Sequence, residues 1–509
     1  MDFPGKTKIA YFLDAPKGFG GAGNLLLEQA RLMEDLYKVV VVIPMDTDGI
    51  KNEEYEKRCE KYGLSYIGLK YGTAYNFMDL GYTGAMRSVA EIEEFARKEE
   101  ITFFHSVQLN LAVEYVSRKL KIPHLMNIYQ LQEKEFKICP ADIYAKYHLC
   151  DSNMYSDLWQ RRLNISSRCI RPVALQDEFR KKKTYIKDKI KILMLGAVCE
   201  RKNQMAAIRA VEACMGSYKM ELRIAGDAGS DYAEECISYA VEHTLSENII
   251  FHGFVSDIMP LLEECDCLLC TSVDESFPSS MVEALTYDLT IISTPIAGVP
   301  EVFVNNHNAF VSMDFSVSGI GESVRECMEC YANGEINRIH QNAEDTWKSN
   351  FDRRLVRQQM DSYYKSILAD KNFKSVDIIL DMKEEICRTE ERLSEVDAEG
   401  EEWVYTRSLY YMFLNKNLCG KETYIWGAGK LGRVTLSVLE RIFPDLKVMA
   451  FIDSHKAGEY CKIPIIKPSD VPIREDASYF ISLARERSRV IRYLEIRGLE
   501  LNTQIWCMP

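Results

Sequence analysis

The sequence lacks any run of 18 apolar residues and any excess of positive charge, and both absences exclude broad classes of protein. Without a long apolar run, a transmembrane helix is not expected. Acidic side chains (76) outnumber basic ones (63), for a net charge of −13. Nucleic-acid binding requires a basic surface, so we expect no nucleic-acid partner. Residues 1–6 lead directly into a strand-like run rather than the apolar core of a signal peptide, which is therefore not expected either.

The 16 cysteines are scattered through apolar strand and helix contexts, which predicts free thiols in a reducing cytoplasm. Two closely spaced groups, Cys265-x-Cys267-x-x-Cys270 and Cys327-x-x-Cys330, have a spacing that also suits zinc. The first group lies in an expected buried strand, whose neighbouring side chains point to opposite faces, and the second lies on an expected helix. We therefore interpret these cysteines as small buried hydrophobes and expect no metal.

The charge is unevenly distributed along the chain. Residues 1–183 carry 27 Lys and Arg against 25 Asp and Glu, so this part is nearly neutral and the acidic excess lies further on. A nearly neutral surface is only weakly attracted to anionic lipid. Weak peripheral association with a membrane would need a local basic patch such as Arg180–Lys183. The expected location is the cytoplasm, with the inner face of the membrane as an alternative.

Apolar runs of strand character alternate with amphipathic helical stretches over most of the chain. This alternation, with short connections, predicts parallel sheets covered by helices on both faces. The pattern restarts after the polar stretch Arg180–Thr184, so we expect two consecutive doubly wound α/β domains with ligands in the crevice between them. The expected strands are Lys8–Leu13, Val39–Pro44, Ile101–His105 and His124–Tyr129, then Ile190–Leu195, Met220–Ala225, Ile249–Phe251, Cys267–Thr271 and Thr290–Ser293.

The most informative segment follows the expected strand Cys267–Thr271. That strand ends in a loop that holds Glu275, and the next helix holds Glu283 about one turn in. Ser279 or Ser280 can cap this helix, whose free amides suit an anion such as a diphosphate. A carboxylate on the helix can accept paired hydrogen bonds from the vicinal hydroxyls of a ribose.

Glu275 and Glu283 form an E-x7-E motif, and a Thr-Pro-x-x-Gly-x-Pro-Glu segment ending at Glu301 follows the next strand. This combination resembles the donor-site signature of family-4 retaining glycosyltransferases, which have the two-lobed GT-B fold. The resemblance implies that Glu275 contacts hydroxyls of the donor sugar and that Glu283 holds the ribose of a nucleotide-sugar. It also implies that the loop between them, Phe277, Pro278, Ser279 and Ser280, binds sugar and phosphate oxygens.

A second element opens the second domain, where Gly196 ends a strand and Lys202 precedes a helix. In the resembled family this lysine contacts the donor diphosphate, where its ammonium group offsets charge on the leaving group. The family commonly has an arginine directly after the glycine, but this chain has Ala197 there. Arg201 is our candidate for a substitute, with a surface salt bridge as the alternative.

Two further loops match the donor side of the resembled family. The resemblance implies that the backbone of Phe254 and Val255 lies beside the nucleotide base, which leaves UDP-, GDP- and ADP-sugars open. In the first domain, the glycine-rich segment 18–23 matches the loop that faces the donor phosphates, which implies contacts from Gly20 and Gly21. A dinucleotide fingerprint is not expected there, because the following strand Val39–Pro44 closes on proline rather than on an acid.

The acceptor side departs from the family pattern. Members often have a histidine close to the transferred sugar, whereas this chain has Tyr129 at the matching position. His105, at the end of the preceding strand, is our candidate for a catalytic role in the cleft, with a structural role as the alternative. Tyr129, Gln130 and Ser106 are expected to contact the acceptor.

A third strand–turn–helix pattern begins at Glu422. Gly427, Gly429 and Gly432 form a G-x-G-x-x-G turn, and Asp453 ends the next expected strand, as in Rossmann-like domains whose acid accepts from a ribose. The segment resembles small nucleotide-binding modules attached to sugar-modifying proteins. This implies a nucleotide in the module, and a docking domain without a nucleotide is the alternative.

The GT-B resemblance covers roughly residues 6–370 and implies that the helix Asp352–Leu368 returns to the first lobe. An acidic helical linker is expected next, because seven of the 13 residues in Glu390–Glu402 are acidic. The expected division is an acceptor lobe at 1–184, a donor lobe at 185–350, a closing helix at 351–370, the linker at 371–418 and a Rossmann-like accessory module at 419–509.

Together the motifs predict a retaining glycosyltransferase that moves a sugar from a nucleotide-sugar to a carbohydrate or lipid-linked acceptor, in surface polysaccharide or glycoconjugate synthesis. No evident nucleophile or Asp-x-Asp metal motif occurs at the donor site. We therefore expect front-face attack without a metal cofactor, helped by Lys202 and helix dipoles. One alternative is a non-catalytic sugar-nucleotide-binding protein, suggested by Ala197 and Tyr129. The other is an NAD-linked sugar-modifying enzyme that works through the C-terminal module. The oligomeric state is left open.

Overall fold

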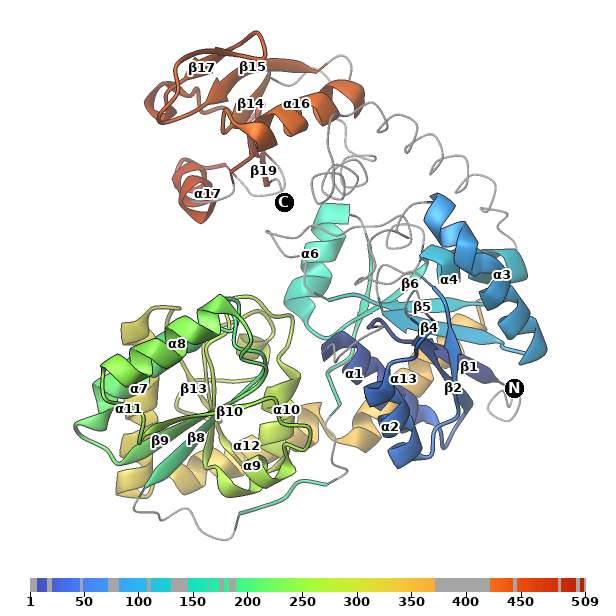
Figure 1. Ribbon diagram of the computed structural model, residues 1–509, viewed down its shortest axis with the longest axis vertical. Helices are drawn as coiled ribbons and strands as arrows, with labels where there is room; N and C mark the ends of the chain where they lie inside the picture. Colours follow the sequence, from blue (N-terminus) through green and yellow to red (C-terminus); the bar gives the residue numbers. More distant parts are fainter. Residues whose placement is uncertain are drawn as a thin grey trace.

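The computed structural model describes residues 7–507 except 16–20, 46–48, 72–81, 108–110, 130–144, 164, 174–177, 183–188, 371–421, 443–445, 484–486 and 500–503. Gly20, Gln130 and the expected linker therefore lie outside the described residues. The described chain forms three sheets, each covered by helices (Figure 1). Among these residues, no helix is both long enough and apolar enough to cross a membrane.

The N-terminal lobe, blue to cyan in Figure 1, is built on a seven-stranded parallel sheet with the order β3-β2-β1-β4-β5-β6-β7. Because the order reverses after β3, β1 and β4 flank the topological switch point of this sheet. The strands are β1 (Lys8–Phe12), β2 (Lys38–Pro44), β3 (Tyr66–Leu69), β4 (Phe103–Val107), β5 (His124–Asn127), β6 (Tyr147–Cys150) and β7 (Arg168–Cys169). The helices are α1 (Gly21–Met33), α2 (Glu53–Tyr62), α3 (Tyr82–Lys98), α4 (Leu111–Leu120) and α6 (Asn153–Leu163).

The second lobe, green to yellow in Figure 1, has a six-stranded parallel sheet with the order β10-β9-β8-β11-β12-β13. Its switch point lies between β8 and β11, so the loops after these two strands emerge side by side. The strands are β8 (Ile190–Leu195), β9 (Met220–Ala225), β10 (Ile249–Gly253), β11 (Cys267–Cys270), β12 (Thr290–Ser293) and β13 (Phe310–Val311). The helices are α7 (Gln204–Met215), α8 (Asp231–Glu242), α9 (Met259–Glu264), α10 (Ser279–Thr286), α11 (Val317–Asn333) and α12 (Ile336–Asn350).

The third sheet, orange to red in Figure 1, has the order β16-β17-β15-β14-β18-β19 and is parallel except for the β16–β17 pair. Its elements are β14 (Glu422–Trp426), α16 (Lys430–Ile442), β15 (Lys447–Ile452), β16 (Gly458–Tyr460), β17 (Ile463–Ile466), β18 (Ser478–Ile481), α17 (Arg487–Glu495) and β19 (Ile505–Cys507). The predicted fold class, two α/β lobes followed by a smaller domain, is confirmed.

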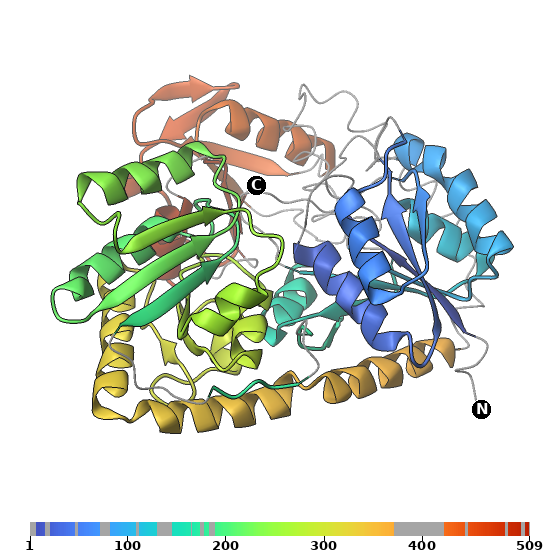
Figure 2. The same ribbon diagram turned by 60° about the horizontal axis from the view of Figure 1, so that its bottom comes forward.

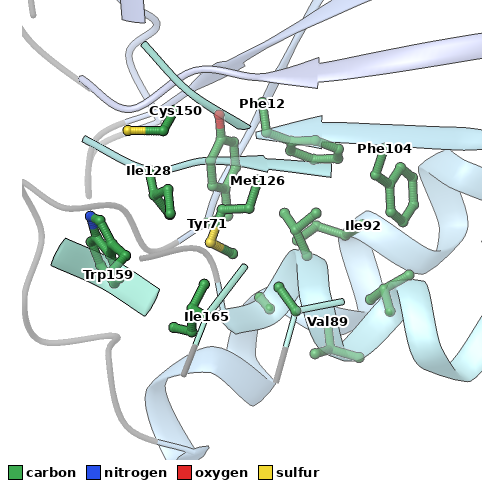
Figure 3. Packing of buried hydrophobic residues seen from close by; sticks show 14 of the residues in the cluster. Phe12, Tyr71, Val89, Ile92, Phe104, Met126, Ile128, Cys150, Trp159 and Ile165 are labelled. Atoms are coloured by element: carbon green, nitrogen blue, oxygen red, sulfur yellow. The ribbon is translucent and has the colours of Figure 1, made fainter. Parts of the chain in front are cut away.

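Alternation along the central strands builds two cores on the N-terminal sheet. Phe12 and Phe104 point to one face, which α3, α4 and α6 cover, and Figure 3 shows them packed with Tyr71 and Trp159. Their chain neighbours Tyr11 and Phe103 point to the other face. Because both faces are buried, the strands read as continuous apolar runs in the sequence.

The helix α13 (Arg353–Leu368) crosses from the second lobe to the first. Figure 2 shows α12 and α13, in gold, beneath the two lobes. Val356, Met360, Tyr364 and Ile367 recur at helical spacing and pack into the N-terminal core with Tyr11 and Phe103.

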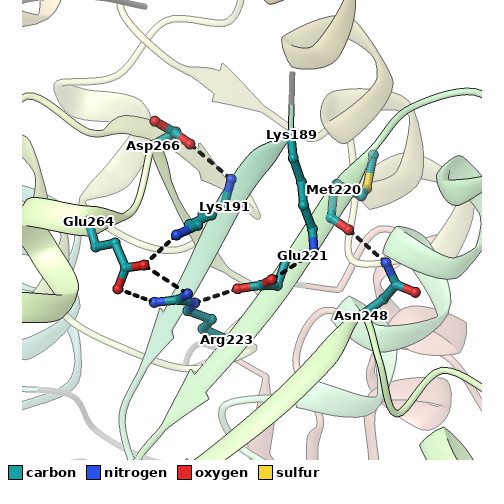
Figure 4. Close-up of polar contacts among 8 residues, drawn as sticks. All are labelled: Lys189, Lys191, Met220, Glu221, Arg223, Asn248, Glu264 and Asp266. Carbon is teal, nitrogen blue, oxygen red and sulfur yellow. Dashed lines mark hydrogen bonds and ion pairs between the residues drawn. The ribbon is translucent and has the colours of Figure 1, made fainter. Parts of the chain in front are cut away.

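A charged network holds the amino ends of β8 and β9 together, as Figure 4 shows. Arg223 donates to both oxygens of Glu264, over 2.5 and 3.1 Å, and Lys191 pairs with the same carboxylate. The hydrogen bonds from Arg223 and Lys191 lower the pKa of this exposed carboxyl to about 2. The network lies at the opposite end of the sheet from the loops that carry Lys202 and Glu275, so it braces the scaffold of the site.

The closely spaced cysteines are buried on two faces of the second sheet. Cys267 and Cys327 have sulfur atoms 3.8 Å apart in one core, whereas Cys265 and Cys270 belong to the other core. Within the described ranges, no three His, Cys, Asp or Glu side chains come together as candidate metal ligands.

Candidate functional site

The two loops at the switch point of the second sheet bring Lys202 and Glu275 together. Thr271, directly after β11, donates its hydroxyl to the carbonyl oxygens of Lys202 and Asn203 at 2.9 Å. The Val273 amide donates to the carbonyl oxygen of Arg201, also at 2.9 Å. These bonds to the backbone therefore fix the distance between the two loops, in addition to the ion pairs between the charged side chains.

Gly196 makes room for the Lys202 side chain. Its φ of +129° is a conformation that residues with a side chain rarely adopt, and a Cβ there would lie 3.1 Å from Lys202 Cε. The lysine stem thus lies across the turn after β8. Ala197, where the resembled family commonly has arginine, is exposed on the same turn.

Glu275 is the centre of the charged group. Its Oε1 lies 2.5 Å from Lys202 Nζ and also accepts a hydrogen bond from Arg201 Nη1. Burial of the carboxylate raises its pKa, but Lys202 and Arg201 outweigh this and hold the pKa below its ordinary value. Glu275 is therefore an anion at neutral pH, and its group with the two cations carries a net positive charge.

Glu283 lies half-buried on α10 and has a different electrostatic environment. Burial raises the pKa of its carboxyl to about 7, and the positive charge of Arg58 lowers it only partly. Arg58 belongs to α2 of the N-terminal lobe, so α10 and α2 face each other across the boundary between the lobes. Near neutral pH this carboxyl is present in both the protonated and the ionised form.

The helix α10 begins differently from the sequence expectation. It starts at Ser279 with Pro278 at the N-cap position, and neither Ser279 nor Ser280 caps it through a side chain. Proline at the N-cap offers no side-chain acceptor to the first amides of the helix. The first amides of α10 therefore have no capping side chain, unlike the expected serine cap.

The other expected donor contacts are spread around these loops. Phe254 follows β10 and is 61 % exposed, and Val255 is half-buried beside it. Phe277 is buried, packs against Phe303 and Phe351, and has the Arg171 guanidinium 5.4 Å from its ring centre. In the N-terminal lobe, Gly21 is the exposed first residue of α1.

His105 is placed in the core and not at the boundary of the lobes. It has no exposed surface, its Nδ1 lies 2.7 Å from the Tyr364 hydroxyl, and its Nε2 lies 2.8 Å from Asn127 Oδ1. Burial lowers the pKa of its imidazole to about 3. The observed position corresponds to the structural alternative, because α13 covers the ring and both nitrogens have partners.

Ser106 and Tyr129, which we expected to contact the acceptor, both have hydrogen-bond partners inside the protein. Ser106 is buried and its Oγ lies 2.7 Å from His124 Nε2, while His124 Nδ1 lies 2.8 Å from Glu114. Tyr129 follows β5, is half-buried, and accepts a hydrogen bond from Asn127 at its hydroxyl. Tyr129 retains some exposed surface, whereas Ser106 belongs to a buried polar chain.

The N-terminal lobe also reaches the donor loop directly, through residues that carried no sequence motif. Tyr155 on α6 donates its hydroxyl to Asp274 over 2.5 Å, and Ser276 donates to Asp151 at the end of β6. Glu301 accepts from Arg171 over 2.6 Å. An acid after a buried strand and a tyrosine on the next helix are weak sequence signals of a functional site. Sequence alone did not reveal these contacts, because the partners of Asp151 and Tyr155 are more than 100 residues away.

In the C-terminal domain the glycine turn and Asp453 lie together, but the acid already has internal partners. Asp453 Oδ2 accepts from the Ala428 amide at 3.1 Å, and Oδ1 accepts from the amides of His455 and Lys456. Lys456 donates back to the Ala428 carbonyl oxygen. In this structure Asp453 therefore joins the turn that contains Gly427 and Gly429 to the turn after β15. Gly432 packs closely against Gly427.

Part of the chain is similar in sequence to a known family. Residues 176–346 match the family described as Glycosyl transferases group 1. The chain is 27% identical over 170 residues to the phosphatidylinositol N-acetylglucosaminyltransferase GPI3 subunit of Saccharomyces cerevisiae, covering 32% of this chain and 35% of that protein. It is 25% identical over 122 residues to the capsular polysaccharide biosynthesis glycosyltransferase CapH of Staphylococcus aureus, covering 24% and 34%. The alignments thus span about a third of each relative.

Structural comparison extends over both lobes. The crystal structure of Anabaena Alr3699/HepE in complex with UDP and glucose superposes with a TM-score of 0.58, covering 71% of this chain and all of that chain, at 17% sequence identity. At that identity the likeness concerns the fold. Residues 176–346 are thus similar to the glycosyltransferase group 1 family, and the two α/β lobes of the chain have the GT-B fold.

Proposed function

We propose that the chain is a retaining glycosyltransferase that moves a sugar from a nucleotide-sugar donor to a carbohydrate or lipid-linked acceptor. The observation that carries the proposal is the group of Arg201, Lys202 and Glu275 at the switch point of the second sheet. Ligands of open α/β sheets bind outside the carboxyl ends of the strands at such a point. Two cations and one anion there favour an anionic ligand with hydroxyl groups nearby.

The diphosphate of the donor is the natural ligand of these cations. Lys202 and Arg201 both pair with Glu275, and they are close enough together to turn toward two phosphate oxygens. The first amides of α10 add the partial positive charge of a helix start. Charge that develops on the leaving diphosphate would be stabilised by the same groups, which raises the rate of bond cleavage.

Glu275 and Glu283 have separate roles in the proposal. Glu275, ionised and held from two sides, accepts hydrogen bonds from hydroxyls of the donor sugar. Glu283, on the helix behind it, accepts from the vicinal hydroxyls of the ribose, which favours its ionised form on binding. With no side chain assigned as a nucleophile, transfer with retention proceeds by front-face attack, and a donor phosphate oxygen takes the acceptor proton.

The relatives support the proposed acceptor class. The names of the two relatives refer to phosphatidylinositol and to capsular polysaccharide biosynthesis, which supports a lipid-linked or a carbohydrate acceptor for this chain. HepE binds UDP and glucose, which makes UDP-sugars the first donors to test. We propose surface polysaccharide or glycoconjugate synthesis as the setting, with transfer that needs no metal cofactor.

The direct test is transfer from a panel of UDP-, GDP- and ADP-sugars by the wild type and by Glu275→Gln. We expect one donor to be turned over and the variant to lose at least about 100-fold in kcat, the cost typical of one lost transition-state contact. Glu247→Gln, an exposed acid on the same lobe, is the control and should match the wild type. Proton NMR of the product checks that the donor anomer is retained, and EDTA checks the metal requirement.

Three results would overturn parts of the proposal. Full activity of Glu275→Gln would remove the site assignment. An inverted product would remove the retaining mechanism. Tight binding of a nucleotide-sugar without transfer to any acceptor would favour the non-catalytic sugar-nucleotide-binding protein, and calorimetry on the same panel detects it.

A further inference from the structure

Both chain neighbours of Glu275 are held by the N-terminal lobe. Asp274 accepts a hydrogen bond from the Tyr155 hydroxyl over 2.5 Å. Ser276 donates its hydroxyl to the Asp151 carboxylate, and its Oγ lies 3.1 Å from Ser152 Oγ. Asp151, Ser152 and Ser276 are at most 4 % exposed, so these bonds lie in a buried contact between the lobes.

A second contact holds the segment after β12 against α6, the helix that carries Tyr155. The Glu301 carboxylate accepts from the amides of Asn153 and Met154, at 3.0 and 2.8 Å, and from Arg171. Burial raises the pKa of Glu301, but the bonds from Arg171 and the two amides outweigh it and keep the acid ionised. A carboxylate at the start of α6 is also favoured by the helix dipole.

Gly298 shows how closely the two contacts approach each other. A Cβ at this position would lie 2.7 Å from Ser152 Cβ and 2.7 Å from a ring carbon of Phe277. The Gly298 amide donates to the Ser276 carbonyl oxygen at 3.2 Å. The N-terminal lobe, the donor loop and the segment after β12 therefore form one packed unit beside Glu275.

We propose that Asp151 is a positioning residue of the transfer reaction, which holds the donor loop in the conformation that presents Glu275 to the sugar. The inference rests on the proposed function. Asp151 acts through Ser276, because its carboxylate accepts the Ser276 hydroxyl and fixes that side chain. Tyr155 holds Asp274 in the same way. Glu275 lies between these two held neighbours and therefore has little conformational freedom. The catalytic site is thereby complete only when the lobes are in contact.

The charge of Asp151 is part of this role. Its carboxyl faces Ser276, Arg171 and Glu275, with Tyr129 and the thiols of Cys150 and Cys169 nearby. Burial raises its pKa to about 7, partly offset by the Ser276 bond. A hydrogen bond to an ionised carboxylate is stronger than one to a neutral acid. The loop is therefore held more firmly above this pH than below it.

The experiment compares Asp151→Ala and Asp151→Asn with Asp157→Asn, an exposed acid further along α6 that serves as the control. For Asp151→Ala we expect kcat to fall about 10- to 100-fold, since small displacements of catalytic groups cost this much. The donor KM should change less than about threefold, because the proposed base and ribose contacts at Phe254, Val255 and Glu283 are left intact.

Asp151→Asn separates the hydrogen bond from the charge. Its amide oxygen still accepts from Ser276, so we expect a kcat between those of the wild type and Asp151→Ala. The rise of wild-type kcat between pH 6 and 8 should flatten in the Asn variant. A merely structural role predicts no such change in the pH profile. Wild-type kcat and pH profile in both variants would overturn the inference.

Amide hydrogen exchange of the unliganded protein separates this inference from the proposed function. Asp151→Ala should speed exchange at Val273–Ser280 at least about tenfold and leave β1 and β14 unchanged. Unchanged exchange in the donor loop overturns the positioning role, whatever the activity. Faster exchange together with a wild type that uses no nucleotide-sugar would support the contact and count against the proposed function alone.

Discussion

Lys202 and Glu275 lie with Nζ and Oε1 2.5 Å apart and join the loop after β8 to the loop after β11. Arg201 shares the same carboxylate oxygen. In the proposed function, a donor diphosphate draws these cations from Glu275 while the sugar hydroxyls approach the released carboxylate. The ion pair would then exchange one anionic partner for another when the donor binds.

Removal of the Lys202 ammonium group should damage the chemical step. We expect Lys202→Ala to lower kcat roughly 100- to 1000-fold, because the charge on the leaving diphosphate loses a preorganised partner. Steady-state kinetics with the donor found in the panel measures the effect. Lys219→Ala, an exposed lysine of the same lobe, should behave as wild type. A Lys202→Ala variant within about threefold of the wild type would contradict the assignment.

Glu283 makes stability depend on pH in an unusual direction for an acid. Burial raises its folded-state pKa from 4.5 to about 7. Between these values the folded protein keeps a proton that the unfolded chain has released, so stability falls as pH rises and levels off above pH 7. Glutamine cannot ionise. Glu283→Gln should therefore be about 2–3 kcal/mol more stable than wild type at pH 8, and equal to it near pH 4.5.

Urea unfolding at pH 5 and pH 8 measures this difference, followed by tryptophan fluorescence, to which the buried Trp347 of the same lobe contributes. Glu247→Gln, fully outside the boundary of the lobes, should show no gain at either pH. Equal stability of wild type and Glu283→Gln at pH 8 would mean that Glu283 is ionised without penalty. The same variant should bind the donor more weakly, because the amide is a poorer acceptor for the ribose hydroxyls.

The placement of Lys202 and Glu275 in loops after strands could be predicted from the strong apolar pattern of those strands, and β8 and β12 have the predicted bounds. Their proposed roles came from the family resemblance. The cross-lobe contacts could not be predicted. Asp151 and Tyr155 lie in an element without a motif, and their partners Asp274 and Ser276 are set only when the lobes meet.

His105 shows the same limit of sequence prediction, here for a residue that the sequence analysis assigned to the site. Its place at the end of the expected strand Ile101–His105 suggested a cleft residue, but β4 runs from Phe103 to Val107 and has His105 at its centre. The ring is covered by Tyr364, which is 259 residues away. Burial by a helix that returns from the other lobe is a property of the tertiary fold, so pattern and spacing around His105 carry no sign of it.

The contact of His105 with Tyr364 should be measurable as stability. The Tyr364 hydroxyl lies 2.7 Å from His105 Nδ1 and 2.9 Å from the Tyr11 hydroxyl, and all three residues are fully buried. Tyr364→Phe leaves the other two groups without this partner, which should cost about 1–3 kcal/mol. Tyr218→Phe, whose hydroxyl is near the surface, should cost less than about 0.5 kcal/mol.

Urea unfolding measures both variants, and hydrogen exchange of α13 shows where the loss occurs. The pKa of His105 is lowered to about 3, so the wild-type pH profile of kcat should contain no step that disappears in Tyr364→Phe. A step of that kind would return His105 to the catalytic role that its position in the sequence suggested.

The close approach at Gly298 gives the last prediction. The backbone there has φ −73°, which alanine adopts freely, so Gly298→Ala acts only through its new methyl group. That methyl would meet Ser152 and Phe277 at 2.7 Å and force the N-terminal lobe away from the donor loop. We expect a loss of about 1–3 kcal/mol in stability and a clear fall in kcat, since overpacking displaces both neighbours.

Gly216→Ala is the matched control, because its φ is −65° and nothing lies within 4 Å of a Cβ there. The double variant Ser152→Gly with Gly298→Ala tests where the strain lies. Removal of the Ser152 side chain makes room on the N-terminal side only, so the pair should recover part of the lost activity, and the two effects should not add. If the losses of the two single variants add in the double variant, the strain lies inside the second lobe, at Phe277. That result would also show that Glu275 keeps its position without the contact between the lobes.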